Sequence, residues 1–222
     1  MVTAQIATIP DRENLLRKTV NSLLPQVDKL NIMLNNYPFT PHFCHNPKIE
    51  VCHLDNSKGD GAKFHGLRTV KGYIFTCDDD LIYPTDYVET MVNVLKSLDN
   101  SVILTNHGRL MHEKPVTSSY SDRKEAFHWR NEQKESVRLD IGGTGVMAWH
   151  SSAFFPNIDD ITIKNMADIW VAKFAKEQGV KIMLCPHKAD WIGYLHPESI
   201  APTIWDEHYP NPKAQTDLYN SF

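Results

Sequence analysis

Short apolar runs alternate with helix-like segments over the first 105 positions of this 222-residue chain. Each run is four to seven residues long and rich in aliphatic or β-branched side chains, as is typical of buried strands. The runs are 2–8, 31–34, 49–54, 73–77 and 102–105. Between them we expect helices from Pro10 to Pro25, over 61–70, and after Pro84. This alternation predicts an α/β fold, with a mostly parallel sheet and helices on both faces.

The second half of the chain is less regular. Residues 106–136 are polar, and we expect a loop excursion with little core of its own that orders when substrate binds. Strands are predicted at 146–149 and 181–184, with a helix over 168–178 that ends at Gly179. The tail from Pro186 onward is expected to run over the surface as an ordered loop.

Composition excludes several classes of protein. Hydrophobic residues make up 41% and charged residues 23% of the chain, and the net charge of −4 offers no electrostatic footprint for nucleic acid. Apolar runs are far too short to span a membrane, and the N-terminus lacks the pattern of a signal peptide. We therefore expect a cytoplasmic protein, in the host cytoplasm if the source is a virus. The four cysteines form no CxxC pair and are expected to be buried thiols.

Three adjacent carboxylates end the apolar run 73–77. Asp78, Asp79 and Asp80 repel one another unless a cation lies among them, which indicates a metal site. Carboxylate oxygens suit Mg²⁺ or Mn²⁺, and these ions keep positions open for phosphate oxygens. The alternative is a group of helix-capping acids before Pro84, although a cap needs one carboxylate.

Two of the three carboxylates can share one ion. In an extended segment Asp78 and Asp80 point to the same side and Asp79 to the other, which favours Asp78 and Asp80 as ligands. A shifted frame, with Asp79 as the main ligand, stays open. No glycine precedes Gly59, so the chain lacks a P-loop, a Rossmann GxGxxG turn and the glycine-rich loop of sugar nucleotidyltransferases.

The order of these features resembles GT-A glycosyltransferases of the broad family-2-like kind, over about residues 2–196. Four stations carry the resemblance: the loop 7–12 after the first strand, Asn35-Asn36 after the second, Asp55 and Lys63 after the third, and Asp78-Asp79-Asp80 with Tyr83-Pro84. The last station resembles the DxD metal motif and its trailing helix. A polar residue after a strand is often only a solvated loop, so the first three stations are weak individually.

The resemblance implies a Rossmann-like GT-A sheet with a small antiparallel element. It implies an enzyme, a hexosyltransferase, that moves a sugar from a UDP-sugar to a hydroxyl of a glycan or other acceptor. Mn²⁺ or Mg²⁺ would be bound by Asp78, Asp80 and His196. The nucleotide sugar would be bound by Thr8, Arg12, Asn35, Asp55, Lys63, Asp78 and Asp79. The nucleotide-binding part would be about 1–105 and the acceptor-binding part about 106–200 of a single domain, with a tail over 201–222.

Asp168 resembles the general base of inverting GT-A enzymes. A carboxylate within reach of the acceptor hydroxyl must accept its proton as the anomeric carbon is attacked. Asp168 also begins a predicted helix, so it is equally a candidate N-cap, and both roles can coexist. The segment Gly142-Gly143-Thr144-Gly145 resembles an acceptor-side loop in which glycines let the backbone approach the sugar, or it is a tight turn.

Two other functions remain open. The same carboxylates could serve a metal-dependent phosphohydrolase or sugar nucleotidyltransferase, although no second metal site is visible. A non-catalytic carbohydrate-binding domain would not need an intact acidic triplet together with Asp168. Residues 214–222 do not resemble the end of a domain, which favours a module of a longer polysaccharide- or capsid-glycosylating protein of bacterial or viral origin.

Overall fold

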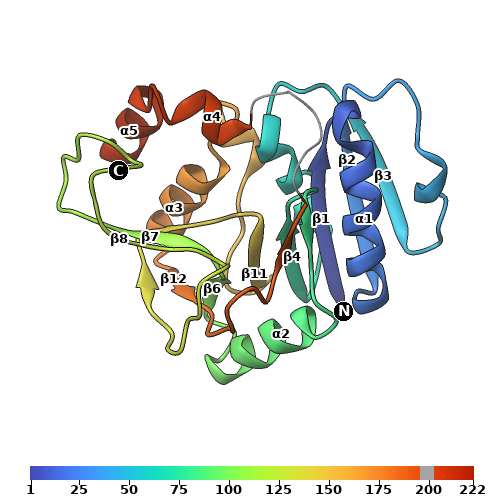
Figure 1. The fold of residues 1–222 in the computed structure, drawn as a ribbon, viewed down its shortest axis with the longest axis horizontal. Helices are drawn as coiled ribbons and strands as arrows, with labels where there is room; N and C mark the ends of the chain where they lie inside the picture. The colour runs from blue at the N-terminus through green and yellow to red at the C-terminus, as the bar shows by residue number, and fades with distance from the viewer. Residues whose placement is uncertain (196–202) are drawn as a thin grey trace.

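The computed structural model describes residues 1–195 and 203–222, and its central feature is a large mixed sheet (Figure 1). The strand order of this sheet is β3-β2-β1-β4-β11-β6-β12-β9. Its strands are β1 (Val2–Thr8), β2 (Lys29–Asn35), β3 (Ile49–Leu54), β4 (Tyr73–Cys77), β6 (Val102–Thr105), β9 (Arg138–Leu139), β11 (Val146–His150) and β12 (Lys181–Leu184). The predicted runs 2–8, 49–54, 73–77, 102–105 and 181–184 agree with strand bounds residue for residue.

Most of the pairing is parallel. β1 pairs in parallel with β2 and β4, β2 with β3, and β6 with β12, whereas β11 runs antiparallel to β4 and β6. The carboxyl ends of β1, β2, β4, β6 and β12 therefore meet at one edge of the sheet, where open α/β folds bind ligands. The prediction of a mostly parallel α/β sheet is confirmed.

Helices pack on both faces of the sheet, as predicted, and each face has its own apolar core. On one face α1 (Glu13–Leu23) and α2 (Tyr87–Ser97) bury Leu16, Val20, Met91 and Leu95. On the other face α3 (Ala167–Glu177) packs with α5 (Lys213–Asn220) and Phe64. Successive residues of β4 enter opposite cores, because side chains alternate along a strand.

The predictions for residues 61–70 and 106–136 were wrong. Residues 61–70 do not form an α-helix; they contain the 3-10 helices η4 (Gly59–Phe64) and η5 (Leu67–Thr69), with Gly66 between them at φ 71°. Residues 106–136 are not a coreless loop, since β7 (Gly108–Met111) and β8 (Arg123–Phe127) pair with β10 (Ile141–Gly142) in a three-stranded antiparallel sheet. This sheet is the small antiparallel element that the resemblance implied.

The tail is helical where it was expected to be a loop. β13 (Gly193–Tyr194) pairs with β5 (Leu81–Ile82), and α4 (Ile204–His208) and α5 follow. The hydroxyl of Thr216 in α5 accepts a hydrogen bond from the backbone N–H of Ser119 at 3.0 Å. The side chain of Asn220 bonds both N–H and C=O of Val116, at 2.9 Å each. These contacts fasten α5 to the segment between β7 and β8.

The remaining short helices lie in the connections: η1 (Pro10–Arg12), η2 (Leu24–Gln26), η3 (His42–Cys44) and η6 (Ile158–Asp160). All four cysteines are free thiols; Cys44, Cys77 and Cys185 are buried as predicted, whereas Cys52 is only partly buried. In the part of the chain that the structure describes, none of the helices has the length and apolar character needed to cross a membrane.

Candidate active site

A cleft of about 930 Å³ opens at the carboxyl edge of the sheet. Eight of the predicted site residues line this cleft: Thr8, Arg12, Asn35, Lys63, Asp78, Asp79, Asp80 and Asp168. Asp55 lies outside the cleft; its exposed carboxylate accepts hydrogen bonds from the backbone N–H and hydroxyl of Ser57. His196 falls outside the described residues. The fold thus brings most of the predicted site residues into one cleft, although some of them lie more than 100 positions apart in the sequence.

Arg12 joins two carboxylates of the acidic triplet. Its Nε and Nη2 donate to Oδ1 of Asp79 at 2.7 and 2.6 Å, and Nη2 also reaches Oδ2 of Asp80 at 2.7 Å. The hydroxyl of Thr8 donates to Oδ2 of Asp79 at 2.6 Å. β4 ends at Cys77 and residues 79–80 form a turn, so the strict side-chain alternation expected for an extended triplet does not hold. Asp79 is nevertheless the carboxylate that is saturated by protein donors.

Asp78 and Asp80 differ from Asp79 in their surroundings. The side chain of Asp78 is 46% exposed, and its Oδ1 accepts a hydrogen bond from Nζ of Lys63 at 2.5 Å. Burial and the negative charges of Asp78 and Asp79 raise the pKa of Asp80 to about 6, although Arg12 opposes this rise. A cation bound near Asp78 and Asp80 would relieve this cost.

The donor set therefore fits a hard divalent cation, for which carboxylate oxygens are suitable ligands. Among residues 1–195 and 203–222, no cluster of three or more His, Cys, Asp and Glu side chains is arranged around a common metal position. The cation would have Asp78 and Asp80 available, while Arg12 and Lys63 hold the acidic cluster together.

Asp60 was not predicted as a site residue. Burial raises the pKa of Asp60 to about 7, while the charge of Lys63 opposes the rise and that of Asp168 adds to it. Its Oδ2 accepts a hydrogen bond from the backbone N–H of Ala167 at 3.2 Å. Asp60, which lies in η4, therefore pairs with a free N–H group at the N-terminus of α3. Its only sequence signal was a single acid between Gly59 and Gly61, just before Lys63.

The segment Gly143-Thr144-Gly145 connects the acidic cluster to Asp168. The N–H of Asp78 donates to the carbonyl of Gly145 at 3.2 Å, and the hydroxyl of Tyr83 donates to the same carbonyl at 2.5 Å. On the other side of the segment, the N–H and hydroxyl of Thr144 both donate to Oδ1 of Asp168 at 2.8 Å. The backbone of Asp78 and the carboxylate of Asp168 thus contact the same short segment.

Asp168 is not the N-cap of α3, since the cap position is Met166, whose own side chain makes no capping hydrogen bond. Thr144 is the donor to Asp168 among the described residues, and both of its hydrogen bonds end on Oδ1. Oδ2 of Asp168 therefore has no protein donor in that part of the chain. Gly145 is a glycine because a Cβ would lie 1.9 Å from Oδ2 of Asp78.

Asn35 presents a polar atom at the far end of the cleft. Its Nδ2 donates to the carbonyl of Gly59 at 3.1 Å and to Oδ1 of Asn56 at 3.2 Å. The Gly59 carbonyl can only accept, so it fixes which end of the amide is the donor. Oδ1 of Asn35 is buried and has no partner among the described residues. It can therefore accept a hydrogen bond from a ligand.

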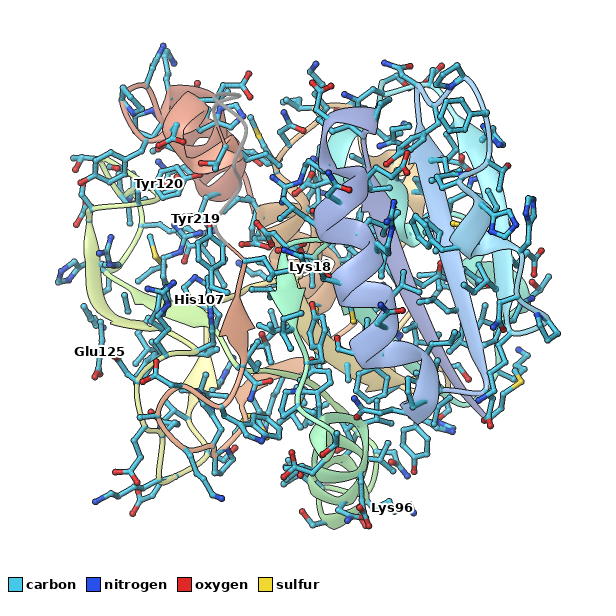
Figure 2. The ribbon with its side chains drawn as sticks, turned by 45° about the vertical axis from the view of Figure 1, so that its right-hand side comes forward. Lys18, Lys96, His107, Tyr120, Glu125 and Tyr219 are labelled. Carbon is cyan, nitrogen blue, oxygen red and sulfur yellow. The ribbon has the colours of Figure 1, made fainter. Side chains whose placement is uncertain are left out.

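The opposite wall of the cleft comes from residues after 105, and most of it was not predicted. Its side chains are His107, Arg109, Tyr120, Arg123, His128 and Trp129. Figure 2 shows His107 and Tyr120 on the same side of the molecule as Tyr219. The ring of Trp129 stacks on His128, with centroids 3.9 Å apart. Aromatic and basic side chains thus face the acidic cluster across the cleft.

Comparisons with known proteins agree with this geometry. The family model Glycosyl transferase family 2 matches residues 8–160. Among solved structures, S. aureus TarS 1–349 has a TM-score of 0.54 at 13% identity, and the match covers 98% of this chain and 69% of the TarS 1–349 chain. TarS 1–349 in complex with UDP-GlcNAc has a TM-score of 0.55 at 11% identity, and the match covers 91% of this chain and 60% of that TarS chain. None of the curated proteins compared with the chain matches it.

The structural likeness confirms the expected GT-A-like fold. The family match covers more than half of the chain and includes the loop after β1, Lys63 and the acidic triplet. The protein is therefore a member of glycosyl transferase family 2.

Proposed function

We propose that this glycosyltransferase moves a sugar from a UDP-sugar to a hydroxyl acceptor, with inversion at the anomeric carbon and with Mn²⁺ or Mg²⁺ bound. The observation that carries the proposal is the segment 143–145, which holds Asp78 on one side and Asp168 on the other. We infer that the leaving diphosphate binds near Asp78 and Asp80 and the acceptor near Asp168, with the transferred sugar between them. Direct displacement in that arrangement inverts the anomeric carbon.

Asn35 supports a uridine nucleotide. The N3–H of uracil is a donor, and the buried Oδ1 of Asn35 is an acceptor without a protein partner. Cytosine N3 and adenine N1 are acceptors, so neither ring nitrogen can donate to the Asn35 oxygen, whereas the N1–H of guanine can, as uracil N3–H does. A TarS structure with UDP-GlcNAc belongs to a protein of the same fold and supports a UDP-sugar donor.

Asp78 and Asp80 are the proposed cation ligands, with His196 as a candidate third. When bound, the cation supplies Lewis-acid stabilisation of the departing diphosphate. Lys63, which is 2% exposed, keeps Asp78 in place through its 2.5 Å hydrogen bond. Burial lowers the pKa of Lys63, but the charges of Asp78 and Asp60 outweigh burial and raise it, so Lys63 stays protonated. Arg12 and Thr8 hold Asp79, which orients the turn that carries Asp80.

Asp168 is the proposed general base. An acceptor hydroxyl has a pKa far above 7, so its proton must pass to a nearby base as the bond to the sugar forms. Thr144 holds Oδ1 of Asp168 with two hydrogen bonds, which orients the carboxylate and leaves Oδ2 for the acceptor. Positioned bases of this kind contribute about 10²- to 10⁴-fold to the rate.

The site also supports the division into a donor part, about 1–105, and an acceptor part from 106 onward. Every residue proposed for the nucleotide and the diphosphate precedes position 105. Asp168 and the basic, aromatic wall follow it.

Calorimetry and a donor panel test the proposal. UDP should bind wild type with Mn²⁺ and much more weakly without it, and Asp80→Ala should abolish the metal-dependent part. Asp168→Asn should keep the UDP affinity and lower sugar transfer, or slow hydrolysis of the donor, by about 10²-fold or more. Equal transfer by Asp168→Asn would remove Asp168 as base. Release of phosphate from simple esters would instead indicate a phosphohydrolase.

A further inference from the structure

Cationic side chains without a carboxylate partner are confined to the acceptor half of the cleft. In the donor half Arg12 pairs with Asp79 and Asp80, and Lys63 pairs with Asp78. In the acceptor half Arg109, Arg123 and Lys164 line the cleft, and in the described part of the chain none of the three forms an ion pair. Glu207, in the same wall, accepts a hydrogen bond from Asn165 instead.

Arg109 is the most informative of these cations. It lies on β7, is 9% exposed, and donates Nη1 to the carbonyl of Ser119 at 2.8 Å. Its guanidinium stacks over the ring of Tyr120 at 4.9 Å, which fixes its plane. The remaining N–H groups of Arg109 have no protein acceptor among the described residues. In the described part of the chain, no nitrogen of Arg109 is among the fully buried atoms that lack a partner, so these donors open onto the cleft, where a ligand can supply the acceptors.

Burial and a neighbouring cation both disfavour the charged form of Arg109. Burial lowers the pKa of Arg109; Asp168 and Tyr120 oppose this, while the positive charge of Arg123 adds to the lowering. Burial, followed by the charges of His128 and Arg109, lowers the pKa of His107 to about 3, so His107 is a neutral neighbour at physiological pH. Arg123 of β8 pairs with Met111, two residues along β7 from Arg109, and both arginines line the cleft, so an anion bound between them would stabilise both.

The donor diphosphate does not match this position. Arg109 pairs with Ile141 of β10, the strand that leads into the segment 143–145, and Thr144 of that segment bonds Asp168, the proposed base. Asp168 is also the carboxylate whose charge acts most strongly on Arg109, whereas the proposed diphosphate position lies at Asp78 and Asp80. Given the proposed function, on which this inference rests, a ligand group at Arg109 belongs to the molecule that brings its hydroxyl to Asp168. We propose that the acceptor carries a compact oxyanion, a phosphate or a carboxylate, bound by Arg109 and Arg123.

Matched sugars test this proposal. The titrants are glucose, glucuronic acid, glucose 6-phosphate and inorganic phosphate, each added to the protein already saturated with UDP and Mn²⁺. The variants are Arg109→Gln and Arg123→Gln. Arg138→Gln, an exposed arginine of β9 outside the cleft, makes the same charge change as a control. Circular dichroism checks that each variant folds. If Arg109→Gln does not fold, the binding measured with Arg123→Gln decides the test.

At least one anionic sugar should bind wild type about tenfold or more tightly than glucose, because charge-assisted hydrogen bonds to guanidinium are among the strong ones. Arg109→Gln and Arg123→Gln should remove this preference and leave the UDP affinity unchanged, while Arg138→Gln should change neither. Preference for glucose 6-phosphate identifies a phosphate acceptor, and preference for glucuronic acid a carboxylate acceptor.

Three results would overturn the proposal. The first is equal binding of glucose and both anionic sugars, or binding of none of them. The second is a loss of UDP affinity in Arg109→Gln as large as the loss for the anionic sugar, which would move Arg109 to the donor site. The third is inorganic phosphate that binds as tightly as the anionic sugars, which would leave only a general anion site. Wild type that binds an anionic sugar but no UDP would instead contradict the proposed donor.

Discussion

Arg12→Met should expose how the acidic triplet is held in the absence of an ion. In the described part of the chain, Arg12 is the cation that contacts both Asp79 and Asp80. The side chains of these two aspartates are 6% and 16% exposed. Methionine keeps much of the arginine stem but removes the charge and the donors. Asp79 and Asp80 would then remain in a nearly buried position without a counter-charge.

The expected loss is about 3 kcal/mol, the lower end of the range for removing one partner of a buried ion pair, because Arg12 is itself 21% exposed. In a chain of this length, each kcal/mol shifts the melting temperature by about 2–4 °C. Arg12→Met should therefore melt roughly 6–12 °C below wild type at pH 8.

The loss should depend on pH in a defined direction. Burial and neighbouring acids raise the pKa of Asp80 from 3.8 to about 6 even with Arg12 present, and without Arg12 it should rise further. A carboxyl with a raised folded pKa binds its proton more tightly in the folded state, so it destabilises the fold when ionised. The deficit of Arg12→Met should therefore be largest above about pH 6 and shrink as the pH falls toward 4.

Thermal unfolding followed by circular dichroism at pH 8 and pH 5 measures both effects. Arg17→Met is the matched control on α1: Arg17 is 52% exposed and pairs with Glu13 one turn away at 3.6 Å. Such helix-surface pairs are worth about 0.5 kcal/mol or less. The reasoning would be refuted if Arg12→Met and Arg17→Met had the same melting temperature at pH 8. It would also be refuted if Arg12→Met lost the same melting temperature, relative to wild type, at pH 8 and pH 5.

Two further predictions concern the cleft. Gly145→Ala should weaken metal-dependent UDP binding, measured by calorimetry, because the new Cβ would displace the Asp78 carboxylate. The melting temperature should change little, because no backbone has to move, and unchanged UDP binding would contradict this contact. Asn35→Leu should lower UDP affinity by about tenfold and reduce the preference for UDP over CDP, because the buried acceptor is lost; a retained preference would remove Asn35 from base recognition.

The donor half could be predicted from the sequence because it depends on strands. Runs such as 73–77 are buried on both faces of the sheet, so their apolar composition marks them, and a polar residue at the end of each run must lie at the ligand-binding edge. The direction in which each carboxylate of Asp78, Asp79 and Asp80 points could not be predicted. It depends on the turn after Cys77 and on Arg12, which reaches the triplet from 67 positions away.

The acceptor half gave weaker signals for a physical reason. β8 has three consecutive exposed residues in the centre of its five, so it carries no alternating apolar pattern, and the surrounding polar residues suggested a loop. Arg109 is a single charge in a short strand, and Asp60, in the donor half, is a single charge whose partner is distant in sequence. The carboxylate of Asp60 meets the N–H of Ala167, 107 positions away. Local sequence cannot show that a charge will be buried by such a contact.

The charge balance of the donor half links the cation to the nucleotide. Asp78, Asp79 and Asp80 together with Arg12 and Lys63 leave a formal charge of −1, and these side chains satisfy one another without an ion. A diphosphate is strongly anionic, so it would meet net repulsion at this cluster unless a divalent cation had reversed its charge. Binding of the cation and of the nucleotide must then be mutually dependent, because coupling between ligands is reciprocal.

The factor by which Mn²⁺ increases UDP affinity should equal the factor by which UDP increases Mn²⁺ affinity. Asp80→Asn should reduce both factors together, measured by calorimetry in the two orders of addition. A UDP affinity that is the same with and without Mn²⁺ would show that the protein's own cations suffice.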